Sequence, residues 1–249
     1  MTDNEKRKIL VLYCGGTIGM RYNKDNLPMV PGSLEDLRNN IPVIEELPYD
    51  ISFENFLSPR TGELLDSSNA EIEYYNSLAG KIGQEIDKYN GIVVVQGTDT
   101  MAPTAGYLSY MLEGLRKPVI FTGAMDPANK PGSDGPKNLT DAINLAGRFG
   151  VDIPAVNEVS ICFYGKIIRG VRAQKFDANN HDAFSAREYP LLGTINGDHV
   201  SINTDEFIPE LSENRSFKIN NISSDISIGS MDITPPISGL KNYIHALGE

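Results

Sequence analysis

The sequence contains few of the residues that build disulfide bonds or metal sites. Its 249 residues include two cysteines, Cys14 and Cys162, and three histidines. Each cysteine lies in an apolar run typical of a strand, and neither forms a CxxC pair, so buried reduced thiols are expected. The HExxH, EF-hand and clustered His–Cys patterns are missing as well. We therefore expect neither a metal nor another cofactor.

Basic residues are outnumbered by acidic ones. There are 22 Lys and Arg residues against 33 Asp and Glu residues, which gives a formal net charge of −11. Binding to nucleic acid depends on clustered Lys and Arg, and an anionic membrane surface attracts the same residues. Neither nucleic acid nor a membrane is therefore an expected partner.

Long hydrophobic runs are also absent. No apolar stretch reaches the length of about 20 residues that a membrane-spanning helix needs. The amino terminus, MTDNEKRK, is charged and leads directly into a short apolar run, without the longer apolar stretch of a secretory signal. A cytoplasmic location is the expectation.

The apolar runs that are present are short, and they alternate with segments of helical spacing. Nearly continuous apolar runs are typical of strands that are buried on both faces of a parallel sheet. Strands are predicted over 8–14, 50–56, 91–97, 117–124 and, as a strand or hairpin, 158–170. Helices are predicted over 34–40, 67–89, 102–115 and 133–150. The alternation predicts an α/β fold, with a mostly parallel sheet and helices on both faces.

The character of the sequence changes near residue 196. Residues 1–195 form the predicted α/β domain, and the polar range 196–225 is predicted to be a linker. The last residues, 226–249, predict one strand, a Pro-Pro turn and one short helix. Such a pair cannot bury a core of its own, so it docks on the first domain, pairs with another chain or begins a further domain.

Hydroxyl groups and glycines follow three of the predicted strands. Thr17 follows Gly15 and Gly16, Thr98 and Asp99 follow a second strand, and Ala124 lies in the Gly-containing turn after a third. In open α/β sheets, ligands bind outside the carboxyl ends of the strands. The GGTIG turn matches neither the phosphate-binding P-loop nor the dinucleotide fingerprint. Taken alone, it is equally well explained as a tight turn, and the second hydroxyl–carboxylate pair favours a nucleophilic site.

A threonine nucleophile needs a base or a lysine to activate it. None of the three histidines, His181, His199 and His245, lies in a motif that provides one, and the G-x-S-x-G elbow of serine hydrolases is absent. Lys175 directly follows a predicted strand and is a candidate, although a lysine in a loop is more often simply solvated.

Five segments, in this order, resemble the signature segments of the bacterial-type L-asparaginases. They are VLYCGGTIGM, DSS at 66–68, VVVQGTDTM, PVIFTGAMDP and RGVRAQKFDANNHDAFSA at 169–186. The pattern is most similar to the cytoplasmic, type I-like branch of that family. The resemblance extends from about residue 8 to the end of the chain.

The resemblance implies an amidohydrolase with a threonine nucleophile. Thr17 matches the residue that attacks the side-chain amide of L-asparagine, forming an acyl-enzyme and releasing ammonia before water releases L-aspartate. Thr98 matches a second catalytic threonine, and Lys175 matches the lysine that is paired with it. Asp99 matches a carboxylate of the catalytic group that also binds the α-ammonium of the substrate.

Further matched residues are implied to hold the substrate. Asp66, Ser67 and Ser68 match the segment that binds the α-carboxylate. Ala124 matches a residue whose main chain contacts the reacting amide. Opposite charges and hydrogen-bond donors at the two ends of a zwitterion orient it before attack.

The loop after GGTIG departs from the family pattern. Members of the family carry a catalytic tyrosine there, and an ungapped alignment places Leu27 at its position. Tyr22 is the nearest tyrosine. The resemblance therefore implies Tyr22 as the catalytic tyrosine only with a shift in the register of the loop.

Length is the second departure. The family continues into a smaller second α/β domain, which is largely absent here, and residues 226–249 resemble its first strand and helix. In the family a neighbouring subunit contributes to the site from that domain, so a homo-oligomer is implied.

Two alternatives to the asparaginase function stay open. One is an amino-acid-binding module without turnover, and the other is an amidotransferase-like subunit that releases ammonia within a larger assembly. The choice between L-asparagine and L-glutamine also stays open, because one methylene group changes specificity by only about 1–3 kcal/mol.

Overall fold

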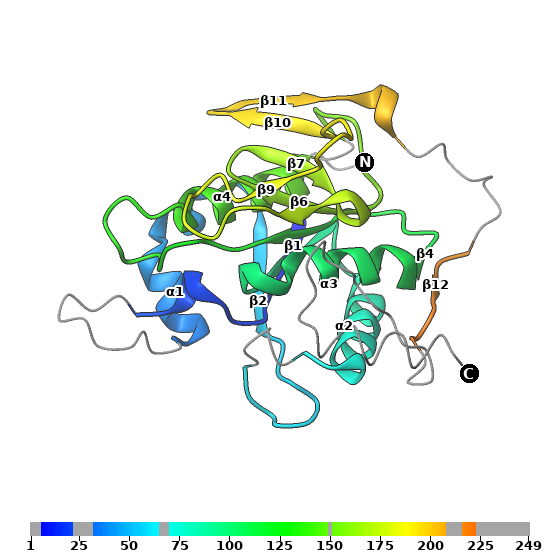
Figure 1. Cartoon of the computed structure of the whole chain (residues 1–249), viewed down its shortest axis with the longest axis horizontal. Helices are drawn as coiled ribbons and strands as arrows, with labels where there is room; N and C mark the ends of the chain where they lie inside the picture. Colours follow the sequence, from blue (N-terminus) through cyan, green and yellow to red (C-terminus); the bar gives the residue numbers. More distant parts are fainter. Residues whose placement is uncertain (1–5, 22–31, 65–69, 149–150, 208–215, 223–249) are drawn as a thin grey trace, which may run out of the picture.

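The apolar runs form the middle of one eight-stranded sheet in the computed structural model of the chain (Figure 1). The structure describes residues 6–21, 32–64, 70–148, 151–207 and 216–222. From one edge to the other, the strands are β11 (His199–Ile202), β10 (Gly193–Asn196), β7 (Lys166–Arg169), β6 (Val159–Phe163), β5 (Val119–Thr122), β3 (Gly91–Val95), β1 (Lys8–Tyr13) and β2 (Asp50–Asn55).

Five neighbouring strands of this sheet run parallel. β1 pairs with β2 and β3, β3 pairs with β5, and β5 pairs with β6, all in parallel. The remaining pairs, β6 with β7, β7 with β10 and β10 with β11, are antiparallel. The predicted mostly parallel sheet is confirmed, and the range 158–170 is a hairpin because β6 and β7 are separated by only two residues.

Helices cover both faces of the sheet, as predicted. In the described residues the α-helices are α1 (Leu34–Asn40), α2 (Ile72–Glu85), α3 (Thr98–Met111) and α4 (Gly135–Arg148). α2 and α3 share a hydrophobic core with Leu10 of β1. α1 and α4 share a second core with Ile9, the preceding residue. Successive side chains of a strand point to opposite faces, so the continuous apolar run of β1 serves both cores.

The helix predicted over residues 102–115 lies four residues earlier, at Thr98–Met111. Proline favours the first turn of a helix, yet Pro103 lies inside this one. There it removes the N–H that would bond to the Asp99 carbonyl, and its ring crowds that carbonyl, so it destabilises the first turns of the helix and packing must offset the cost. Thr98 and Asp99 therefore lie on the first turn of α3 and not in a loop, so the helix fixes their positions in the site.

Part of the range predicted as a linker belongs to the first domain. β11 is a strand of the large sheet, and β12 (Lys218–Ile219) pairs with β4 (Leu112–Glu113), to the right in Figure 1. The Asn76 side chain bonds to both the backbone nitrogen and oxygen of Ile222, at 2.8 and 2.9 Å. Residues 226–249 lie outside the described residues, and the division into domains stays a prediction.

α1 begins at a capping box formed by Ser33 and Asp36. The Asp36 backbone N–H donates to Ser33 Oγ at 3.1 Å, and the Ser33 backbone N–H donates to the Asp36 carboxylate at 2.8 Å. Arg21 pairs with the same carboxylate at 3.0 Å. Hydrogen bonds from Ser33, followed by that from Arg21, lower the pKa of Asp36 to about 2. Asp36 thus links Arg21 and Ser33, which lie on either side of the range 22–31.

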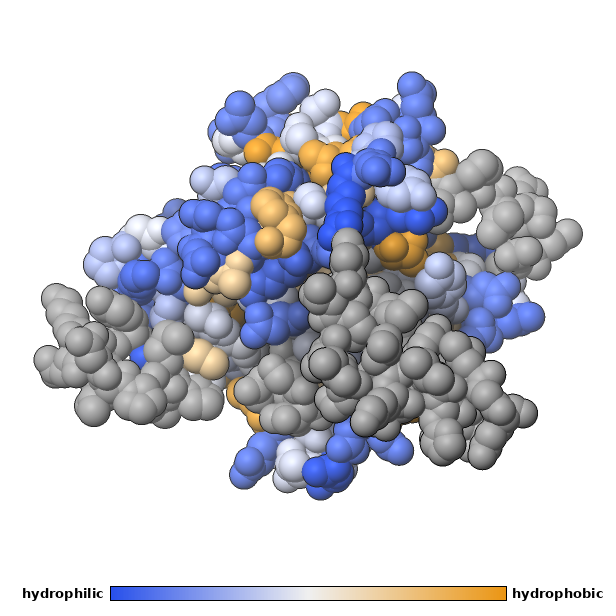
Figure 2. All heavy atoms as spheres, in the orientation of Figure 1, coloured by the Kyte–Doolittle hydropathy of each residue, from blue (hydrophilic) through white to orange (hydrophobic). Residues whose placement is uncertain are grey.

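The surface seen in Figure 2 is mainly hydrophilic, with apolar residues in scattered patches. None of the helices in the described part of the chain is long and apolar enough to cross a membrane. The remaining short elements are η1 (Thr17–Gly19), η2 (Pro42–Glu46), η4 (Gly170–Arg172), β8 (Gln174–Lys175), β9 (Phe184–Ser185) and η5 (Thr204–Glu206).

Candidate active site

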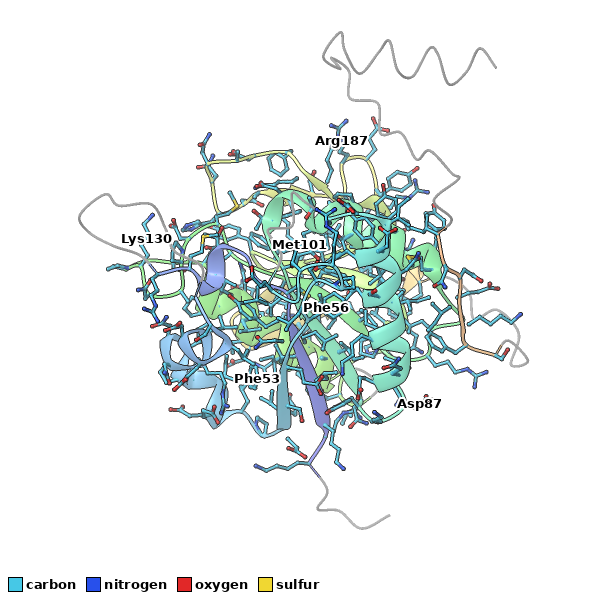
Figure 3. All side chains as sticks on the ribbon, turned by 90° about the horizontal axis from the view of Figure 1, so that it is seen from below. Phe53, Phe56, Asp87, Met101, Lys130 and Arg187 are labelled. Atoms are coloured by element: carbon cyan, nitrogen blue, oxygen red, sulfur yellow. The ribbon has the colours of Figure 1, made fainter. Side chains whose placement is uncertain are left out.

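Three of the predicted site segments meet at the carboxyl ends of the central strands. β1, β3 and β5 are neighbours and run parallel, so the turns that follow them lie on one edge of the sheet. Thr17 lies in η1 after β1, Thr98 begins α3 after β3, and Ala124 lies two residues after β5. In Figure 3, Met101 of α3 and Lys130 of the β5–α4 loop lie on this side, whereas Asp87, which precedes β3, lies on the other.

Glycine allows these turns to touch one another through their backbones. Gly16 has φ +99, and a Cβ atom there would lie 2.5 Å from the backbone nitrogen of Gly97. A Cβ atom on Gly123 would lie 2.4 Å from the carbonyl oxygen of Gln96. No side chain fits at such distances from backbone atoms. The turn that carries Thr17 and the turn that carries Ala124 are therefore both pressed against the turn before Thr98.

Replacing Gly16 by alanine is expected to lower the free energy of unfolding by about 3 kcal/mol or more, because a strained φ adds to an unavoidable contact. The matched control is Gly197→Ala. Gly197 also has a positive φ, +60, but a Cβ atom at that position would meet nothing within 4 Å. That variant is expected to lose only about 1 kcal/mol. Urea unfolding of both variants measures the difference, and equal losses would contradict the close approach of the two turns.

Lys175 joins the site from a distant part of the sequence. It lies on β8, and its Nζ donates to Thr98 Oγ1 at 2.8 Å and to Asp99 Oδ1 at 2.6 Å. Thr98 is buried, and only 15% of the Lys175 side chain is exposed, whereas 74% of the Asp99 side chain is exposed. The Thr98 hydroxyl and the Lys175 amine are therefore shielded from water. The Asp99 carboxylate faces solvent, where a ligand can reach it.

The turn that carries Ala124 is held by a buried carboxylate that sequence reasoning missed. Asp134 accepts hydrogen bonds from the backbone N–H groups of Met125 and Asp126 at 3.0 and 3.1 Å. Asn138 Nδ2 donates both to this carboxylate and to the Gly123 carbonyl, each at 3.0 Å. The only signal in the sequence is two polar residues four positions apart at the start of a helix, which is common in caps.

Gln96 is a second residue that sequence reasoning missed. Its Nε2 donates to Thr100 Oγ1 at 3.1 Å and to Thr104 Oγ1 at 2.8 Å, and its backbone N–H donates to the Thr122 carbonyl at 3.0 Å. Gln96 thereby fixes the first turns of α3 relative to β5. The orientation of Thr98 depends on that position.

Several predicted site residues lie outside the described residues. They are Tyr22, Leu27, Asp66, Ser67 and Ser68. The catalytic tyrosine and the α-carboxylate segment therefore stay predictions. Thr17, Thr98, Asp99, Ala124 and Lys175 are described, and the contacts above join Thr98, Asp99 and Lys175 directly.

The arrangement has the components of nucleophilic catalysis. A lysine amine contacts both a threonine hydroxyl and a carboxylate, and a second threonine lies on the neighbouring glycine-rich turn. Backbone N–H groups at such turns can stabilise a developing oxyanion. Within the described residues, no group of three or more His, Cys, Asp and Glu side chains is suited to hold a metal ion.

Comparison with known proteins gives one consistent family. The family model described as "Asparaginase, N-terminal" matches residues 8–207. The chain is 37% identical over 190 residues to L-asparaginase 1 of Escherichia coli K12, covering 76% of this chain and 53% of that protein. It is also 35% identical over 216 residues to the 60 kDa lysophospholipase of Mus musculus, covering 80% of this chain and 37% of that protein.

The solved structures agree with the sequence matches. The structure of L-asparaginase I from Vibrio cholerae superposes with a TM-score of 0.76 at 31% identity, covering 95% of this chain and 68% of that one. The chain spans about half the length of the E. coli protein, or 53%. The family model that the chain matches describes the amino-terminal part of an asparaginase.

Proposed function

The chain belongs to the asparaginase family, and we propose that it is an amidohydrolase that converts L-asparagine and water into L-aspartate and ammonia. The observation that carries the proposal is the contact of Lys175 with both Thr98 and Asp99, next to the turn of Thr17. A relay of hydroxyl, amine and carboxylate is what a threonine nucleophile needs to lose its proton at neutral pH.

In the proposed reaction, Thr17 Oγ1 attacks the carbon of the side-chain amide and forms a tetrahedral intermediate. The hydroxyl proton passes through the Thr98–Lys175 pair to the amide nitrogen, which leaves as ammonia. Water then attacks the resulting ester, releases L-aspartate and returns the proton to Thr17. Each step keeps the charge inside a site whose polar groups are already oriented, which lowers the barrier.

The substrate is proposed to be held at both of its charged ends. Asp99, whose side chain is mostly exposed, binds the α-ammonium group. Asp66, Ser67 and Ser68 bind the α-carboxylate, and the main chain at Ala124 contacts the reacting amide. Tyr22 is proposed as the catalytic tyrosine of the loop. These roles follow from the family resemblance, and the buried position of Ala124, on a turn that packs against the turn before Thr98, supports the role of its main chain.

Assembly and location are further proposals. A homo-oligomer in the cytoplasm follows from the same resemblance, with a catalytic domain that extends past residue 195 to include β11 and β12, and with residues 226–249 as the start of a second domain. L-Glutamine is proposed as a weaker substrate, because it carries the same amide on a chain that is one methylene longer.

The test is the formation of products from L-asparagine by the purified chain. Ammonia and L-aspartate are expected in a ratio of one to one, with slower release of ammonia from L-glutamine. A rise in melting temperature with L-asparagine but no ammonia would overturn the hydrolase and favour an amino-acid-binding module, because a ligand stabilises the state that binds it. If the chain shows no turnover and its melting temperature does not change with L-asparagine, both functions are excluded for this chain.

A further inference from the structure

The arm that carries Lys175 has little structure of its own to hold it. β8 and β9 pair over only two positions, Gln174 with Ser185 and Lys175 with Phe184. One more backbone bond, from Phe176 N to Ala183 O at 3.0 Å, closes the loop between them. A two-stranded hairpin is marginally stable by itself, so the position of Lys175 depends on contacts with the rest of the fold, both the burial of Phe184 in the core and the contacts made by the loop.

His181 provides such a contact with a different part of the site. Its Nε2 lies 3.0 Å from Asp126 Oδ2 and 3.9 Å from Asp134 Oδ1. The His181 and Asp126 side chains are 32% and 22% exposed, so their bond is partly protected from water. This pair joins residues 55 positions apart, one on the Lys175 arm and one on the loop after β5.

Asp126 belongs to the turn that carries Ala124. Its backbone N–H donates to the buried Asp134 carboxylate at 3.1 Å, as does that of Met125, the residue after Ala124. The side chain of Asp126 therefore projects from a turn that the Asp134 carboxylate holds at its backbone. A bond to this side chain joins the Lys175 arm to that turn, so each segment limits the opening of the other.

The charges around His181 suit a hydrogen bond to a carboxylate. Asp126 Oδ1 accepts from Lys130 Nζ at 2.6 Å, which leaves Oδ2 for His181. Although burial raises the pKa of the Asp126 carboxyl, the hydrogen bonds from Lys130 and His181 outweigh it, and the pKa lies below its usual range. The carboxylate is therefore ionised at neutral pH and is a strong acceptor.

We propose that His181 and Asp126 form a latch that fixes the arm carrying Lys175 against the turn carrying Ala124, and that His181 is a positioning residue for amide hydrolysis. The positioning role rests on the proposed function, whereas the latch itself is a property of the fold. His181 touches neither Thr17 nor Thr98 in this role. It acts by keeping the Lys175 amine in register with the place where the amide binds.

Another ion pair on the same loop makes a matched control. Lys166 Nζ bonds to Asp182 Oδ1 at 2.5 Å, and Asp182 is the residue after His181. Lys166 lies on β7, so this pair ties the loop to the sheet and not to the Ala124 turn. Asp182→Asn therefore weakens the loop to a similar degree without opening the latch.

Hydrogen–deuterium exchange of the full chain tests the latch, and the measurement does not require the chain to be catalytically active. His181→Ala and Asp126→Ala are each expected to speed exchange in peptides of both 174–185 and 123–128 by about tenfold. The double variant should exchange no faster than Asp126→Ala, which also loses the bond to Lys130, because the latch is already open in that variant. Asp182→Asn should affect 174–185 only. Faster exchange confined to 174–185 in His181→Ala would overturn the latch.

Steady-state kinetics with L-asparagine test the positioning role. His181→Ala is expected to lower kcat by about tenfold with little change in KM, because the amine is misplaced while substrate binding remains. His181→Gln places an N–H donor near the position of Nε2 and is expected to recover most of kcat. Equal kcat in wild type and His181→Ala would overturn the positioning role. A wild-type chain without turnover would instead reject the proposed function, and exchange would still decide the latch.

Discussion

Thr17→Ala is expected to abolish the release of ammonia from L-asparagine, lowering kcat by at least about four orders of magnitude. The side-chain hydroxyl is the atom that forms the proposed ester, and loss of a nucleophile costs most of the rate enhancement of such enzymes. Thr17 lies half-buried in η1, so its Cγ and hydroxyl can be trimmed without opening either core. The loss should therefore appear in kcat and not in folding.

Two variants make this result specific. Thr140→Ala removes a hydroxyl of similar burial that bonds to the Pro136 carbonyl within α4, and it is expected to keep kcat within about twofold. Thr17→Ser keeps a hydroxyl and should retain part of the activity. Thr17→Ala should still show a rise in melting temperature with L-aspartate, because the proposed binding groups remain. If Thr17→Ala has the same kcat as the wild type, Thr17 is not the nucleophile.

Lys175→Met is expected to lower kcat by about two to four orders of magnitude, the usual range for a residue that transfers protons. Methionine is similar in length and keeps the apolar contacts of the stem. It removes the bonds to Thr98 at 2.8 Å and to Asp99 at 2.6 Å. Asp99 stays in place to bind the α-ammonium group, so KM is expected to change far less than kcat.

Further variants test whether the loss of kcat comes from the broken relay or only from the removal of a positive charge. Lys166→Met removes an ion pair to Asp182 from the same part of the fold but reaches no threonine, and kcat should change by less than about threefold. Thr98→Ala and Lys175→Met should each cost about as much as the double variant, because residues that act as one unit are not additive. Additive losses, or a near-normal Lys175→Met, would contradict the relay.

The fold could be predicted from local patterns. Continuous apolar runs such as 8–14 and 91–97 are strands because both of their faces are buried, and helical spacing placed α1 at 34–40. The start of α3 was wrong by four residues, because the proline that normally marks a first turn lies inside the helix. Local preference decides the type of an element more reliably than its ends.

The site could be predicted in part. Carboxyl ends of neighbouring parallel strands meet at one edge, so Thr17, Thr98 and Ala124 could be assigned to a common edge from the predicted sheet alone. The roles of Asp66, Ser67, Ser68 and Tyr22 stay predictions, since these residues lie outside the described part of the chain. Lys175 had only weak support from its place after a predicted strand, and the family resemblance supplied the rest, because a two-residue strand leaves no periodic signal.

By itself, then, the sequence determined which segments are buried, which strand ends carry hydroxyls, and where glycine permits a close approach. Only the tertiary structure decided which of these segments touch. The contact between Lys175 and Thr98 spans 77 positions, and that between His181 and Asp126 spans 55. The Asp134 carboxylate beneath the Ala124 turn is equally invisible in the local pattern. Such contacts depend on how loops that are distant in the sequence pack over the sheet, and the local spacing of residues does not predict that packing.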